Sequence, residues 1–102
     1  MSRIRSITQL TNKTTAVTIN AYNGIITTVA LTDAADTSFV FVINNNKIRP
    51  TSNIQLTPVN TGNGIVALNI TAKARGSITV RVANTGNAAF NSAISINMTV
   101  IG

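Results

Sequence analysis

The chain has 102 residues, a usual length for a single domain. It contains no histidine, cysteine or glutamate, and its only acidic side chains are Asp33 and Asp36. It therefore lacks the common proton carriers, the thiol nucleophile and the transition-metal ligands of proteins. We expect no enzymatic activity and no cofactor.

Charge and composition point to a β protein that works by binding. The net charge is +6, yet charged residues make up only 10% of the chain, against roughly 25% in a typical domain. The β-branched residues isoleucine, valine and threonine are abundant, and so is asparagine. The former pack well in sheets and the latter favours turns. A surface rich in threonine and asparagine, with few charges, indicates packing within an assembly.

The N-terminal segment, residues 1–10, places two isoleucines beside two arginines. It can be interpreted as the first strand of the chain's own sheet, or as an arm that adds a strand to a neighbouring subunit. The predicted partner-binding residues are Arg3, Ile4, Arg5 and Ile7. Polar residues from Thr8 onward interrupt any apolar run, so we expect no secretion signal and synthesis in the cytoplasm. No apolar stretch is long enough for a membrane span.

Alternation of apolar and polar residues predicts most of the later strands. The clearest runs are residues 17–20, 64–72, 78–82 and 94–100. Residues 39–43 are apolar throughout, which predicts a central strand buried on both faces, with Phe39 and Phe41 in the core. Pro58 closes a weaker strand over 54–57, which we place at a sheet edge because proline cannot donate to a ladder.

Turns rich in asparagine and glycine separate these runs and complete the fold prediction. They lie at residues 22–24, 44–46, 60–63, 75–76 and 84–87, and residues 32–37 are predicted to form a loop. The pattern predicts one all-β domain over residues 1–102. Its architecture is expected to be an antiparallel β-sandwich of jelly-roll type with about seven or eight short strands.

The two aspartates and the basic residues were the remaining candidates for a binding site. Asp33 and Asp36 could offer oxygen ligands only to calcium, and calcium loops usually supply more of them, so we expect two turn aspartates without a metal. A basic face can bind phosphates without reading sequence, but no RNA-binding aromatic motif is present. The cations are also scattered along the chain: Arg3, Arg5, Lys13, Lys47, Arg49, Lys73, Arg75 and Arg81. Adhesion to any acidic surface explains the charge equally well.

Three stretches in combination resemble a known type of protein. They are residues 6–9 leading through 14–20 to 24–29, then 41–45, and then 76–80 through 84 to 96. Together they resemble a recurrent small β-sandwich among the virion proteins of tailed bacteriophages, often from aquatic and cyanobacterial phages. The likeness spans nearly the whole chain. It is a general similarity of sequence and does not include a motif with a known mechanism.

This resemblance implies a structural role in a virion. Such modules are either head decoration (cement) proteins or domains of fibres and spikes. Because the sequence contains no coiled coil or collagen-like repeat, we expect a decoration protein, a homotrimer that binds the major capsid protein on the capsid surface. A lumenal position facing DNA is the alternative location. The second hypothesis is a fibre, spike or adhesin domain that binds host glycan or another tail protein, and the third is a basic nucleic-acid-binding module.

Overall fold

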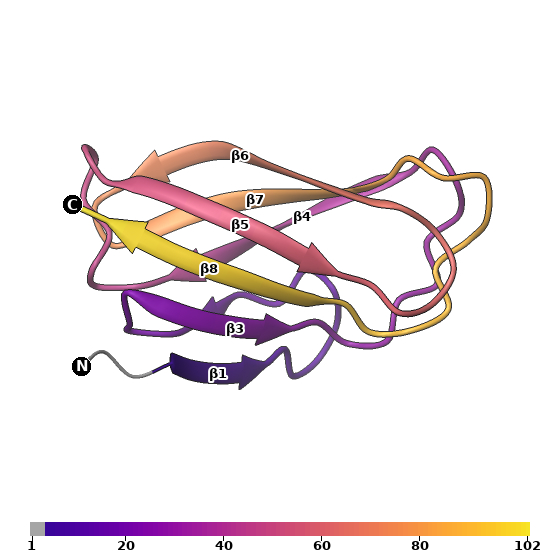
Figure 1. Cartoon of the computed structure of the whole chain (residues 1–102), viewed down its shortest axis with the longest axis horizontal. Coiled ribbons are helices and arrows are strands. Elements are labelled where there is room, and N and C mark those ends of the chain that lie inside the picture. Colours follow the sequence, from indigo (N-terminus) through magenta and orange to yellow (C-terminus); the bar gives the residue numbers. More distant parts are fainter. Residues whose placement is uncertain (1–3) are drawn as a thin grey trace.

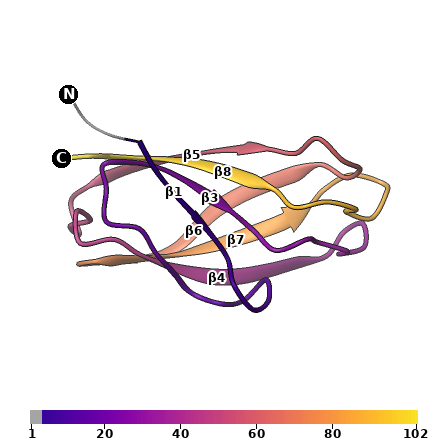
Figure 2. The ribbon, with the colours of Figure 1, turned by 90° about the horizontal axis from the view of Figure 1, so that it is seen from below.

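The computed structural model describes residues 4–102, and within them it contains eight strands and no helix. The strands are β1 (Ile4–Thr8), β2 (Val17–Thr18), β3 (Asn23–Thr27), β4 (Ser38–Asn44), β5 (Asn53–Val59), β6 (Val66–Ala74), β7 (Ser77–Asn84) and β8 (Ser95–Ile101). They form two four-stranded sheets that pack face to face in a sandwich-like arrangement (Figures 1 and 2). The all-β class and the number of strands predicted from the sequence are confirmed.

The strand order differs from a purely antiparallel arrangement. Sheet A has the order β1-β3-β8-β5 and sheet B the order β2-β4-β7-β6. In each sheet the first pair, β1 with β3 and β2 with β4, is parallel, and the other pairs are antiparallel. The prediction of antiparallel sheets is therefore wrong for these two pairs. The chain visits the opposite sheet between the two strands of each parallel pair, which supplies the long crossover that parallel pairing requires.

One core lies between the two sheets and joins them. Alternate residues of β7 and β8 point inward, as their patterns predict, and Val80 and Ile96 have no exposed surface. Phe39 and Phe41 are buried in the same cluster, which confirms their predicted place in the core. Burying a side chain of this size contributes roughly 1.5–3 kcal/mol.

β4 is an interior strand, but only one of its faces is buried. Val40 is 46% exposed, and it lies opposite Arg81 of β7 on the outer face of sheet B. The prediction that residues 39–43 are covered on both sides is wrong, because a structure of two layers has nothing to pack on its outer faces. β2 is also shorter than the predicted strand over 17–20, and it pairs only with Ile43 and Asn44.

The turn predictions hold except at residues 22–24. There the bend comes at residues 21–22, and Asn23 and Gly24 begin β3. A Cβ at Gly24 would lie 2.6 Å from Cδ1 of Ile19, so a larger residue at this position would have to displace the end of that side chain. Residues 32–37 form a loop as predicted. β5, with Pro58 near its end, lies at the edge of sheet A, which confirms the position inferred from the proline.

Candidate partner-binding surfaces

The predicted N-terminal arm belongs to the chain's own sheet. β1 runs parallel to β3 in continuous register from Ile4 opposite Asn23 to Thr8 opposite Thr27. Ile7 packs against the core, whereas Arg5 is exposed. Arg3, the remaining predicted partner-binding residue, lies outside the described residues. The structure therefore places this segment as an edge strand of sheet A, and its role in partner binding stays a prediction.

Both aspartates lie at one end of the molecule, in the loop before β4. The carboxylate of Asp33 is buried, and its Oδ2 accepts a hydrogen bond from Nζ of Lys13 at 2.7 Å. Asp36 has a left-handed backbone (φ 63°), and its backbone N–H donates to the carbonyl of Asn84. Asp33 thus forms an ion pair with Lys13. Within residues 4–102 no group of three or more His, Cys, Asp or Glu residues could hold a metal ion.

The opposite end of the molecule brings four cations together. We call Lys47, Arg49, Lys73 and Arg75 the basic end, which lies on the left in Figure 1. Two backbone hydrogen bonds of 2.9 Å join the segments that carry them: Asn45 N–H donates to the carbonyl of Gly76, and Gly76 N–H donates to the carbonyl of Ile48. Sequence reasoning missed this cluster because its members lie in two distant segments. Its only signal was that both segments adjoin predicted turns.

Among the described residues, no ion pair forms at the basic end. The single ion pair among the described residues is Lys13–Asp33, near the other end. Nζ of Lys47 lies 5.4 Å from the ring centroid of Tyr22, which is 49% exposed. Exposed tyrosine is enriched in protein interfaces, whereas lysine is more common at their rims and on the rest of the surface. The basic end therefore offers both positive charge and aromatic surface to a partner.

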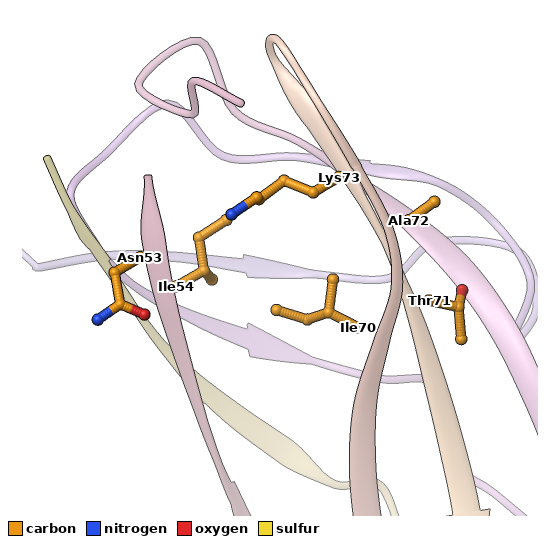
Figure 3. A pocket seen from close by; sticks show the side chains of 6 residues that line it. All are labelled: Asn53, Ile54, Ile70, Thr71, Ala72 and Lys73. Carbon is orange, nitrogen blue, oxygen red and sulfur yellow. The ribbon is translucent and has the colours of Figure 1, made fainter. Parts of the chain in front are cut away.

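A second candidate surface is a groove with an apolar floor on one long side of the molecule. It lies between β5 and β6, the edge strands of the two sheets, and we call it the edge groove. Its floor consists of the half-buried side chains Ile54, Leu56, Leu68 and Ile70. The hollow beside Lys73 has a volume of about 340 Å³, and the hollow next to it along the strands about 270 Å³. Figure 3 shows Ile54 and Ile70 facing each other across the first hollow.

Lys73 spans the groove at the basic end. Its Nζ donates to the backbone carbonyl of Ser52 at 2.6 Å, so a side chain from β6 reaches the residue that precedes β5 (Figure 3). Ser52 is buried and is itself fixed by a hydrogen bond from its N–H to the carbonyl of Arg49. The lysine thus ties the edges of the two sheets together while keeping its charge near the groove.

Comparisons with known proteins yield no relative. No family model, no curated protein and no solved structure matches the chain. In the part of the chain that the structure describes, no helix is long and apolar enough to cross a membrane. The basic end and the edge groove, with its apolar floor, are the two candidate binding surfaces of the described residues.

Proposed function

We propose that the protein is a non-enzymatic structural module of a virion, a capsid decoration protein that binds an acidic surface of the outer shell through its basic end. The proposal rests on the separation of charge along the molecule, whose longest dimension is 37 Å. Four cations gather at one end, while both aspartates lie near the other and Asp33 is paired with Lys13. Such a distribution orients a molecule toward a negative surface and speeds its association.

The uncharged outer face of β3, β5 and β8 in sheet A fits a role in which copies pack side by side. β3, β5 and β8 contain no charged residue. Their outward-facing side chains include the polar residues Thr57 and Asn97 and the exposed apolar residues Val59 and Ile101, so these strands present an uncharged outer face. Copies related by local symmetry, such as the proposed trimer, would meet on such faces without charge repulsion.

The finer description of the fold is part of the same proposal. From β3 to β6 each strand lies in the sheet opposite to that of the strand before it. This alternation between two sheets is a feature of jelly rolls, a common architecture of capsid domains. We therefore propose a jelly-roll-like sandwich with β1 and β2 added in parallel at one side.

Charge reversal at the basic end tests the binding mode. The double variant R49E/R75E should bind purified shells of the parent virus about ten-fold more weakly than the wild type, measured by co-sedimentation, because two attractive contacts become repulsive. The single variants R75E and R81E give a matched comparison. Both residues are exposed, but only Arg75 belongs to the basic end. Equal loss of binding in R81E and R75E would contradict attachment through the basic end.

The location in the virion is tested separately by copy number. Quantitative mass spectrometry of purified virions should find a copy number comparable to that of the major capsid protein. A much smaller number would instead indicate a fibre or spike domain. A gel shift of DNA that vanishes both with added salt and in R49E/R75E would indicate phosphate binding by the basic end, and would replace the decoration proposal.

A further inference from the structure

The edge groove has the properties of a site for strand addition. β5 and β6 are the last strands in their sheets, so one side of each backbone is unpaired. Unpaired strand edges are templates for an additional strand from another chain. β5 contains Pro58, which lacks a backbone donor, whereas β6 contains no proline. The register of β6 with β7 shifts between Ile70 and Ala72, so the part of β6 before this irregularity is the better acceptor of a new strand.

The floor of the groove has the spacing that an extended peptide requires. Leu68 and Ile70 are two residues apart on β6, and Ile54 and Leu56 are two residues apart on β5. Side chains on one face of an extended segment repeat about every 6.6–7 Å. The two hollows along the groove can therefore receive successive inward-facing side chains of one strand, and these side chains should be apolar.

Lys73 adds a requirement for charge at one end of the groove. The partner of its ammonium group is a neutral carbonyl, that of Ser52. A carboxylate is a stronger acceptor for an ammonium group than a neutral carbonyl is. An acidic residue placed where the groove meets the basic end would therefore be favoured by Lys73 and by the charge of Arg75, two residues further along the chain.

We propose that the edge groove binds an extended segment of an acidic partner protein, which pairs with β6 over residues 66–70. The segment carries apolar residues at alternate positions and an acidic residue beside Lys73. A second copy of this chain is a poorer occupant, since each copy has a net charge of +6 and the approach of two such edges brings like charges together. The inference goes beyond the proposed function, because it concerns a different surface and does not require a capsid.

Orientation follows from strand pairing. β6 runs toward Lys73, and antiparallel pairs are slightly more stable per residue than parallel pairs. The acidic residue should therefore lie at the N-terminal end of the bound segment. The probe is a synthetic nine-residue peptide, equal in length to β6, with an N-terminal aspartate followed by alternating valine and threonine. The comparison peptide carries asparagine in place of the aspartate.

The decisive measurement is fluorescence anisotropy of the two labelled peptides with the full chain. We expect the aspartate peptide to bind K73Q about ten-fold more weakly than the wild type, because a hydrogen bond to a charged group is lost. The asparagine peptide should bind both proteins equally. K73M serves as a second variant, and the unfolding midpoint of each variant checks that it is folded.

The result can also overturn the proposal. Equal affinity of the aspartate peptide for the wild type and both Lys73 variants would do so, as would the absence of binding. NMR shifts confined to β5 and β6 on titration would support the site, and shifts centred elsewhere would contradict it. Concentration-dependent dimers whose interface maps to β6 would assign the groove to a second copy instead. None of these measurements uses virus shells, so a negative result would contradict the groove proposal and leave the decoration proposal unaffected.

Discussion

Each end of the molecule is held together by a buried asparagine, but the two ends expose different charges. At the basic end, Asn45 is almost fully buried, and its amide group holds the segment before β3 to the turn after β4. Its Nδ2 donates to the carbonyl of Ala21 at 2.6 Å, and its Oδ1 accepts from the N–H groups of Ala21 and Lys47. One side chain therefore satisfies three backbone groups that would otherwise be unpaired away from water.

Asn84 performs the corresponding task at the opposite end. Its Nδ2 donates to the carbonyls of Asp33 and Ala88, and its Oδ1 accepts from the N–H groups of Ile65 and Gly86. Three separate loops converge on this one amide. The comparison shows that buried asparagines fix the loops at both ends, so the exposed residues of those loops are free to differ. We therefore expect the exposed side chains of Arg49 and Arg75 to contribute little to folding.

The largest expected effect comes from removing these amides. N84A should lower the free energy of unfolding by about 3 kcal/mol and N45A by about 2 kcal/mol, because four and three backbone groups respectively lose their partner. Urea unfolding measures both. N87A is the matched control, since Asn87 is exposed in the same loop as Asn84 and should change stability by less than about 0.5 kcal/mol. Similar values for N84A and N87A would show that the buried amide does not hold that end.

A pair of glycines sharpens the comparison. Gly64, near the Asn84 end, and Gly76, at the basic end, both have positive φ, 89° and 83°. A Cβ on Gly64 would lie 2.5 Å from Cδ1 of Phe90, whereas a Cβ on Gly76 meets no atom within 4 Å. G76A should therefore cost only the backbone strain, about 1 kcal/mol, and G64A about 2 kcal/mol or more. Equal thermal shifts for the two variants would contradict the packing of Phe90 against Gly64.

The smallest effects are expected from charge. R49Q and R75Q should change the free energy of unfolding by less than about 0.5 kcal/mol, because neither side chain has an ion-pair partner among the described residues. D33N is the exception and should cost about 1.5–3 kcal/mol, since it removes the charge of a buried carboxylate that accepts a hydrogen bond from Lys13. Urea unfolding at low and high salt measures both. A large loss in R75Q would show that the cations of the basic end stabilise the fold itself.

The local features of this fold could be predicted from the sequence, whereas its long-range features could not. Period-two alternation located most strands, and Pro58 placed β5 at an edge, because both signals act within a few residues. The parallel pairing of β1 with β3, and the one-sided burial of β4, depend on where distant strands pack. Alternation of apolar residues within one strand does not indicate which distant strands it will pair with or pack against.

The binding surfaces were hidden for the same reason. Arg49 and Arg75 become neighbours only through the hydrogen bonds between Asn45, Gly76 and Ile48. The edge groove exists only because β5 and β6 end their respective sheets on the same side. Asn45 and Asn84 were recognised as turn residues, but their buried amide bonds involve partners such as Ala21 and Asp33, far away in the sequence.

The position of β8 also determines when the fold can be completed. β8 comes last in the chain but lies inside sheet A, between β3 and β5, and pairs with both. β3 and β5 have no other link within that sheet, so sheet A cannot close until β8 has left the ribosome. Pairings of such wide sequence separation form in milliseconds to seconds. We therefore expect sheet A to be completed only once β8 is available, whereas all four strands of sheet B precede β8 in the sequence and can pair earlier.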